Sequence, residues 1–336
     1  METIRRAWSN QASVGSGPPP PSARRHAVID VGTNSVKLLV ADVCGRDVRP
    51  VGEDSRQTRL GKGFYESNHL QPEAIARTAD AVAEFARVAR ADHAAAIRVI
   101  ATSAARDAVN ADELTAAITQ ASGLKVEIIS GEQEAEWAFQ GVTTDPDLAQ
   151  TPLLLLDVGG GSTEFILGQG DQKHFAHSFP LGTVRLLEKF PHSDPPTRGE
   201  FTACRDWLKQ FLKNEVRPKL ESALQRETKL HPQAGEIQLV GTGGTTSILA
   251  RIDLKLERFD RDRIEDARLS LAQVKAHRKQ LWALPLAERK QTIGLPKLRA
   301  DVILTGVSIY EAVMEEFGFQ ELRVSTRGLR FAAVMD

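Results

Sequence analysis

Two glycine-rich loops of the same design constrain this 336-residue chain most strongly. The first, Asp-Val-Gly-Thr-Asn-Ser, occupies residues 30–35, and the second, Asp-Val-Gly-Gly-Gly-Ser-Thr-Glu, occupies residues 157–164. Each follows an apolar run, at 27–29 or 153–156, and precedes another, which predicts two strand-turn-strand tips. Because glycine lets main-chain N–H groups approach an anion closely, the duplication predicts a phosphate cleft between two similar domains.

Polar side chains in these loops supply the other groups that a phosphate site needs. Hydroxyls follow the glycines in both loops, at Thr33 and Ser35 and at 162–163, and add hydrogen-bond donors. The aspartate that begins each loop, Asp30 or Asp157, can hold a divalent cation against a phosphate, because such cations prefer oxygen ligands. Both loops therefore predict binding of an anion together with a cation.

A third glycine-rich segment follows the strand-like residues 237–240 and precedes the helix-like residues 248–250. This strand-turn-helix junction is a candidate seat for a nucleotide or a second phosphate. Its glycines could instead serve only to pack a helix onto a strand. One such turn is weak evidence for binding, whereas three favour it. The candidate residues are Gly241, Thr242, Gly243, Gly244 and Thr245.

Composition and turn signals set the expected domain limits. Residues 1–24 combine Ser and Gly with four consecutive prolines and contain no apolar signal segment, which predicts a disordered tail. Strands and helices then alternate, as in an α/β domain, up to a turn-rich connector at 143–147. We therefore expect a first domain over 25–142 and a second over 143–336.

The three loops together resemble those of the actin, sugar kinase and Hsp70 superfamily, whose two ribonuclease H-like domains each carry a phosphate loop. Six further segments narrow the resemblance to the exopolyphosphatase and guanosine pentaphosphate phosphatase (Ppx/GppA) family. They are RLGKG at 59–63, VIATSAARDAVN at 99–110, ISGEQEA at 129–135, PLGTVR at 180–185, RADVILTG at 299–306 and STRGLR at 325–330. The similarity extends from about His26 to the end of the chain.

This resemblance implies an α/β fold with two ribonuclease H-like, or actin-like ATPase, domains that face an interdomain cleft. Longer members of the family carry further domains after this region, so we expect the short two-domain form. The resemblance also implies a homodimer.

The resemblance assigns one glutamate to catalysis. Locally, Ser130 predicts a helix cap, and the acidic residues that follow could merely complement the helix dipole. In the family, the glutamate directly before an alanine on this helix is the base that activates water, and Glu134 precedes Ala135 here. The resemblance therefore implies Glu134 as the general base, with Glu132 as the local rival.

The resemblance also implies ligands for a metal ion and for the phosphate. Mg²⁺, or another divalent cation, would be held by Asp157 with Glu164 nearby. Arg106 would add a fixed cation, although it could instead form a structural salt bridge, for example with Asp107. The implied phosphate ligands are Thr33, Asn34, Ser35, Arg106, Gly159, Gly160, Gly161, Ser162 and Thr163.

The implied activity is hydrolysis of the terminal phosphate of inorganic polyphosphate, by metal-assisted attack of a water that Glu134 activates. Removal of the 5′ γ-phosphate from guanosine pentaphosphate uses the same attack and is the alternative. A third hypothesis is a non-catalytic protein that senses guanosine alarmones. Guanosine penta- and tetraphosphate and adenine nucleotides are the further candidate ligands.

Composition argues against other classes of protein. At 41% hydrophobic residues the chain can form two packed domains, but no apolar run approaches the roughly 20 residues of a membrane span. Aromatic residues make up only 6%, and no nucleic-acid recognition motif is present. Cys44 and Cys204 have neither metal-ligand nor redox spacing, which fits the reducing cytoplasm. We expect a cytoplasmic enzyme that binds neither membranes nor nucleic acid.

The net charge of −1 does not by itself select a polyanionic substrate, so any attraction must come from clustered charge. Two stretches are rich in Lys and Arg, at residues 209–219 and 289–299. Either could steer an anion, but the pattern favours ordinary solvated helix faces.

Overall fold

The computed structural model describes residues 20, 22–230 and 237–335. Of the predicted disordered tail, residues 1–19 and 21 lie outside this described part of the chain. Arg24, which the sequence placed at the end of that tail, is the first residue of a strand.

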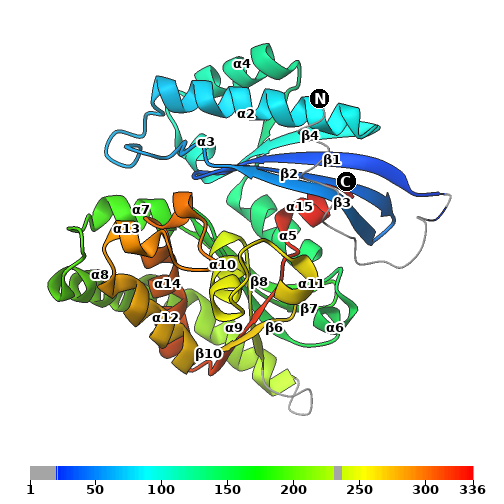
Figure 1. Ribbon diagram of the computed structural model, residues 1–336. Coiled ribbons are helices and arrows are strands. Elements are labelled where there is room, and N and C mark those ends of the chain that lie inside the picture. Colours follow the sequence, from blue (N-terminus) through cyan, green and yellow to red (C-terminus); the bar gives the residue numbers. More distant parts are fainter. Residues whose placement is uncertain (1–19, 21, 231–236, 336) are drawn as a thin grey trace. The chain divides into compact units, whose positions relative to one another are not determined.

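The described residues form two compact units (Figure 1). The first contains the residues up to Trp137 together with those from Leu329 onward, and the second is Ala138–Gly328. The sequence-based limits placed everything after residue 142 in the second domain, whereas the contacts assign the last residues to the first unit. The domain limits themselves stay a prediction.

The C-terminal helix α15 (Leu329–Ala333) explains this difference. Its apolar residues Leu329 and Phe331 are buried in one cluster with Val28 and Leu39 of the first sheet. Arg330, on the same helix, donates a hydrogen bond of 2.9 Å to the main-chain carbonyl of residue 38 and lies 3.2 Å from a carboxylate oxygen of residue 53. Burial of this apolar face holds the last turn of the chain on the first unit.

A five-stranded sheet is the centre of the first unit. The strand order is β3-β2-β1-β4-β5, in which β1, β2 and β3 are antiparallel while β4 and β5 run parallel to β1. The strands are β1 (Arg24–Val31), β2 (Val36–Cys44), β3 (Asp47–Arg56), β4 (Ala96–Ala101) and β5 (Val126–Ile128). The first glycine loop joins β1 to β2, as predicted.

Helices α2 (Pro72–Ala91) and α4 (Ala111–Ser122) cover one face of this sheet (Figure 1). One apolar stripe of α2 is buried, because its members recur every four or three residues and so fall on one side of the helix. They are Ile75, Ala79, Val82, Ala86 and Ala89. The short helix α3 (Ser103–Asp107) follows β4, and α5 (Gly131–Val142) follows β5.

The second unit contains a six-stranded sheet of order β10-β11-β9-β6-β7-β8. Its antiparallel strands β6, β7 and β8 correspond to β1, β2 and β3, and β9 and β11 run parallel to β6 as β4 and β5 run parallel to β1. The strands are β6 (Leu153–Val158), β7 (Thr163–Gln169), β8 (Gln172–Phe179), β9 (Gln238–Thr242), β10 (Arg268–Ser270) and β11 (Glu321–Val324). The predicted α/β class with two similarly built domains is confirmed.

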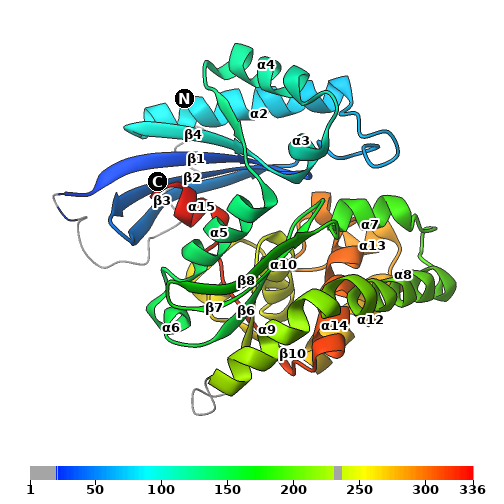
Figure 2. The same cartoon turned by 180° about the vertical axis from the view of Figure 1, so that it is seen from behind.

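Most of the remaining helices pack against this second sheet. The central one, α14 (Ile303–Phe317), is buried from Ile303 to Met314 and belongs to the main apolar cluster of the unit. The others are α6 (Pro146–Ala149), α7 (Thr183–Lys189), α8 (Arg198–Phe211), the π-helical turn η1 (Leu212–Val216), α9 (Arg217–Leu230), α10 (Gly244–Asp253), α11 (Arg261–Ile264), α12 (Leu271–Ala283), α13 (Leu286–Arg289) and the 3₁₀ turn η2 (Lys297–Arg299). Figure 2 shows α8, α9, α12 and α14 gathered beside this sheet.

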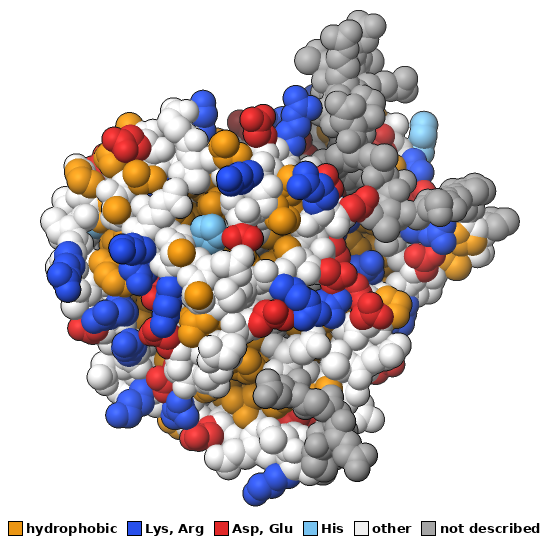
Figure 3. Space-filling model, turned by 60° about the horizontal axis from the view of Figure 1, so that its bottom comes forward, with side chains coloured by type: hydrophobic (Ala, Val, Ile, Leu, Met, Phe, Trp, Pro, Cys, Tyr) orange, Lys and Arg blue, Asp and Glu red, His pale blue; other side chains and the backbone are white. Residues whose placement is uncertain are grey.

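Surface character agrees with the nearly neutral composition. On the face drawn in Figure 3, Lys and Arg side chains are interspersed with Asp and Glu side chains. Among the described residues, no helix combines the length and the apolar character that a membrane span requires.

The interpretation of the basic stretch at 289–299 as a solvated face is wrong for Arg289, because the Arg289 side chain is 0% exposed. Its Nη1 donates to the carbonyl of Ala300 and its Nη2 to the carbonyl of Leu284, both at 2.9 Å. Burial lowers the pKa of this guanidinium. Arg289 is therefore a structural cation that fixes the chain on both sides of α13, and it contributes no surface charge.

Replacing Arg289 by Met should destabilise the protein, because two buried carbonyl groups lose their donor. We expect the free energy of unfolding to fall by about 2–4 kcal/mol, as measured by chemical denaturation. Lys279→Met, at an exposed position on α12, is the matched control and should change it by less than about 0.5 kcal/mol. Equal stability of the two variants would contradict this role.

Candidate active site

The second glycine loop turns its carbonyl groups toward the start of α7. The carbonyl oxygens of Gly159, Gly160 and Gly161 all accept hydrogen bonds from residues 183–185, at 2.8 to 3.1 Å. In a trans peptide, the C=O of one residue and the N–H of the next point in opposite directions. The N–H groups of residues 160–162 therefore point away from α7, where they can donate to an anion.

Gly182 is what allows α7 to come this close. A Cβ atom at this position would lie 2.3 Å from the oxygen of Gly160 and 2.4 Å from the nitrogen of Gly161. Both are main-chain atoms of the loop, so no side chain can be accommodated without moving it. The Thr163 hydroxyl, at the other end of the loop, donates to the carbonyl of Leu181.

Two carboxylates lie side by side where this loop joins its strands. Asp157 on β6 and Glu164 on β7 are direct partners in the antiparallel ladder, so their side chains are on the same face of the sheet. Glu164 is buried and accepts a hydrogen bond of 2.7 Å from the Ser178 hydroxyl. Burial, together with the charge of Asp157, raises the pKa of Tyr310 well above its usual value.

This pair fits a magnesium site in its chemistry. The described residues contain no group of three or more His, Cys, Asp or Glu side chains that could hold a metal ion. Mg²⁺ does not need one, because it usually keeps several waters and binds one or two carboxylates together with substrate phosphates. Asp157 and Glu164 match that ligand set.

The third glycine loop lies against the same aspartate. Asp157 pairs in register with Thr242 on β9, and a Cβ atom on Gly243 would lie 2.7 Å from Oδ1 of Asp157. Gly243 has a φ of +91°, which favours glycine. The loop then begins α10, and a Cβ atom on Gly244 would lie 2.5 Å from Nη2 of Arg299. The start of α10 thus combines a helix N-terminus with a guanidinium group.

The first glycine loop has the same internal turn as the second. The N–H of Gly32 donates to the carbonyl of Ser35 at 3.1 Å, as Gly159 donates to Ser162 at 2.9 Å. The RLGKG segment lies behind it: Gly61 donates to the carbonyl of Thr33, and residue 59 donates to the carbonyl of residue 34. The N–H groups that follow these two carbonyls therefore point away from the RLGKG segment.

Arg106 and Glu134 form an ion pair within the first unit. Nη1 of Arg106 lies 3.0 Å from Oε2 of Glu134 and donates to the carbonyl of Ile129 at 3.0 Å. The alternative of a salt bridge for Arg106 is thus realised, but its partner is Glu134 and not Asp107. Glu134 is only 7% exposed, whereas its local rival Glu132 is exposed. The predicted Ser130 cap is present, since its hydroxyl accepts the N–H of residue 133.

Asp30, at the start of the first loop, is buried, and its hydrogen bonds and neighbouring charges do not fully offset the cost of burying its carboxylate. It is 6% exposed, and its Oδ1 has no hydrogen-bond partner among the described residues. Burial raises the pKa of its carboxyl group, and the positive charges of Lys37 and Arg330 offset only part of this rise.

The predicted residues thus form one group in each unit. The first unit brings Arg106 to Glu134, and the second gathers Asp157, Glu164 and two glycine loops. Sequence reasoning gave no role to Gly182, Arg185 or Arg299, which shape or border these loops. The signal that could have identified them was their place in the matched segments at 180–185 and 299–306.

Two α/β units with the same strand scheme, each with a glycine loop at the first hairpin, define a phosphate-handling protein of the actin-like class. Residues 39–335 match the Ppx/GppA phosphatase family. The chain belongs to this family. The predicted family and the predicted fold, two actin-like domains, are confirmed. The roles of the individual residues stay predictions.

Known relatives agree with this assignment. Exopolyphosphatase 2 of Mycobacterium tuberculosis is 35% identical over 314 residues, which cover 90% of this chain and 94% of that protein. The guanosine-5′-triphosphate,3′-diphosphate pyrophosphatase of Photobacterium profundum is 29% identical and covers 94% of this chain, but the match spans 60% of that longer protein. The solved structure of the Aquifex aeolicus PPX-GPPA enzyme has a TM-score of 0.73 at 30% identity, covering 93% and 99% of the two chains.

Gly182→Ala should reduce phosphatase activity, because the new methyl group collides with the main chain of the second loop. A displacement of about 1 Å in a catalytic group can cost roughly 10²-fold in rate, and we expect a loss of that order in steady-state phosphate release. Gly199→Ala on α8 is the control, since its Cβ atom would meet only the Thr197 side chain at 3.9 Å. Full activity of Gly182→Ala would refute the proposed packing.

Asp30→Asn should stabilise the protein at neutral pH. The folded-state pKa of Asp30 is raised, so ionisation of the unfolded chain favours unfolding once the pH exceeds the ordinary carboxyl value. The stability difference between variant and wild type should therefore be small at acidic pH and grow as the pH rises. Denaturation at several pH values tests this, with exposed Asp80→Asn as control. A difference that does not change with pH would show that Asp30 carries no such penalty.

Proposed function

We propose that this chain hydrolyses the terminal phosphate of inorganic polyphosphate, with Glu134 as the general base. The observation that supports this most directly is the buried Glu134 carboxylate, held at 3.0 Å by Arg106. The M. tuberculosis relative, which matches nearly end to end, is named an exopolyphosphatase.

In this reaction, the oxygen of a water molecule forms a bond to the terminal phosphorus while the anhydride P–O bond breaks. The water gives a proton to Glu134, and the shortened polyphosphate leaves with the bridging oxygen. Arg106 fixes the carboxylate and supplies a positive charge near it. Since Glu132 is exposed and Glu134 buried, only Glu134 has a fixed position from which to orient a water.

Main-chain N–H groups of the glycine loops bind the phosphate oxygens in this proposal. The carbonyl groups of the second loop are engaged by α7, so its N–H groups already point away from that helix and need no rearrangement when an anion binds. Asp157 and Glu164 would hold Mg²⁺, which neutralises charge on the phosphate oxygens when it is bound.

Guanosine pentaphosphate is the alternative substrate. The observation that favours it is the third loop, where the start of α10 meets Arg299 and could take further phosphate groups of a nucleotide. The P. profundum relative is named for action on this type of nucleotide. A protein that only binds such nucleotides would keep the loops but would not need Glu134. A cytoplasmic location stays part of the proposal.

Glu134→Ala should lower turnover by about 10²–10⁴-fold, the usual contribution of a general base. The measurement is phosphate release by purified protein with Mg²⁺, offered short polyphosphate, long polyphosphate and guanosine pentaphosphate in parallel. Glu132→Ala is the matched control and should retain most activity.

Loss of activity in Glu132→Ala, with retention in Glu134→Ala, would show that the base is wrongly assigned. Release from guanosine pentaphosphate alone would move the function to the alternative. Tight binding of that nucleotide without release from any substrate would favour the sensor.

A further inference from the structure

One carboxylate holds the turn that follows β11. It belongs to Glu265, the residue directly after α11. Its Oε1 accepts a hydrogen bond of 2.9 Å from the Ser325 hydroxyl, and its Oε2 accepts the N–H of Thr326 at 2.7 Å as well as the Thr326 hydroxyl. Hydrogen bonds to an ionised acceptor are stronger than those between neutral groups. Three such bonds therefore fix the start of the turn on Glu265.

The main chain around Glu265 is itself fixed on both sides. Its N–H donates to the carbonyl of Arg261 at 2.7 Å. Directly after it, the N–H of Asp266 donates to the carbonyl of Val324 at 3.0 Å, and the N–H of Val324 donates to the carbonyl of Ala267 at 2.8 Å. Because its main chain is already ordered, the Glu265 side chain loses little further conformational entropy when it binds the turn.

The same turn holds the third glycine loop. The N–H of Ser325 donates to the carbonyl of Gly241 at 2.9 Å. In the other direction, the hydroxyl of Thr242 donates to the carbonyl of Arg327. A Cβ atom on Gly328 would lie only 2.8 Å from Oγ1 of Thr242, so the turn packs closely on the loop. The position of the turn therefore determines the position of the first two residues of the third loop.

We propose that Glu265 is a positioning residue for the candidate active site, because it holds the turn at 325–327 and, through it, the third glycine loop. The proposal rests on the proposed function, and it assigns to that loop the phosphate groups of the substrate that are not released. Asp157 is held in addition by the β6–β7 ladder, where it pairs with Glu164. Loss of Glu265 should therefore weaken substrate binding and leave the carboxylates for Mg²⁺ in place.

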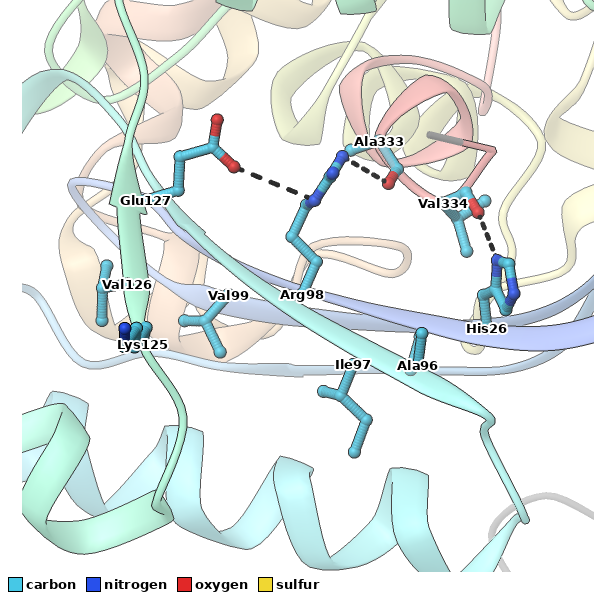
Figure 4. Close-up of a pocket in the computed structure, with 11 residues that line it drawn as sticks. His26, Ala96, Ile97, Arg98, Val99, Lys125, Val126, Glu127, Ala333 and Val334 are labelled. Atoms are coloured by element: carbon cyan, nitrogen blue, oxygen red, sulfur yellow. Dashed lines mark hydrogen bonds and ion pairs between the residues drawn. The ribbon is translucent and has the colours of Figure 1, made fainter.

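Helix α15 is the other element that could position this turn, because it follows the turn directly in the chain. Figure 4 shows how the end of α15 is anchored beside a pocket of the first unit. Nη1 of Arg98 donates to the carbonyl of Ala333 at 3.4 Å. Nδ1 of His26 lies 3.2 Å from the carbonyl oxygen of Val334. These contacts do not involve Glu265, so substitutions can separate the two anchors.

Glu265→Ala should raise the KM for the substrate by about tenfold or more, because the third loop is no longer held in its binding position. The kcat should change by less than about twofold, since phosphate groups that are bound equally in the ground state and the transition state contribute to KM alone. Steady-state phosphate release with Mg²⁺ measures both constants. A purely structural loss of folded protein would lower kcat and leave KM unchanged.

Three further variants separate this role from others. Glu265→Gln keeps an oxygen that accepts from Thr326 and gains an amide that can donate to the Ser325 hydroxyl, so it should restore most of the affinity. Arg98→Met removes one anchor of α15 and should leave the KM unchanged. Asp262→Ala, at an exposed position on α11, is the matched control and should behave as the wild type.

Calorimetric binding of tripolyphosphate and guanosine pentaphosphate keeps the test independent of turnover. In the Glu134→Ala background, Glu265→Ala should raise their dissociation constants by about tenfold. If it does so although the wild type releases no phosphate, the proposed function is wrong and the positioning role of Glu265 stands. Unchanged dissociation constants, an equal rise of KM in Arg98→Met, a fall of kcat without a rise of KM, or a Glu265→Gln variant as impaired as Glu265→Ala would each overturn the proposal.

Discussion

The hydrogen bonds that residues at the start of α7 donate to carbonyl groups of the second glycine loop are the interaction on which the anion site of the second unit depends. Once residues 183–185 engage three glycine carbonyls, planarity of the peptide bond determines where the loop N–H groups point. The requirement for Gly182 and the ordered start of α7 follow from this contact. In the first loop, the RLGKG segment takes the place of α7: its N–H groups donate to loop carbonyls and so determine where the N–H groups of that loop point. Both units therefore prepare anion donors from the main chain, where no side-chain rotamer has to be fixed.

Among the described residues of the first unit, the buried carboxylates Asp30 and Glu134 illustrate how neighbouring groups determine the free-energy cost of a buried charge. Glu134 has the guanidinium of Arg106 within hydrogen-bonding distance. Asp30 is buried to a similar extent, but its Oδ1 lacks a partner among the residues that the structure describes, and burial dominates its pKa. Such an uncompensated group at the start of a phosphate loop is the kind of local cost that proteins tolerate at functional positions.

Local patterns in the sequence predicted the features that depend on neighbouring residues. The hairpin loops and the Ser130 cap are both found in the structure. Features that depend on the folded path of the chain were missed. Arg289 sits in a charged stretch, yet the carbonyl groups of Leu284 and Ala300, on either side of that stretch, accept its hydrogen bonds and allow its burial. Likewise, the residues next to Gly182 in the sequence do not reveal that it packs against Gly160 and Gly161 of the second glycine loop, from which strands β7 and β8 separate it.

The return of the C-terminal helix to the first unit has a consequence for biosynthesis. The second unit is one continuous stretch of chain, so every part of it is synthesised before α15. The first unit is discontinuous, and α15 supplies the apolar cover of Val28 and Leu39. During translation, that face of the sheet remains uncovered until α15 leaves the ribosome. The domain whose synthesis begins first is therefore the one whose core is completed last.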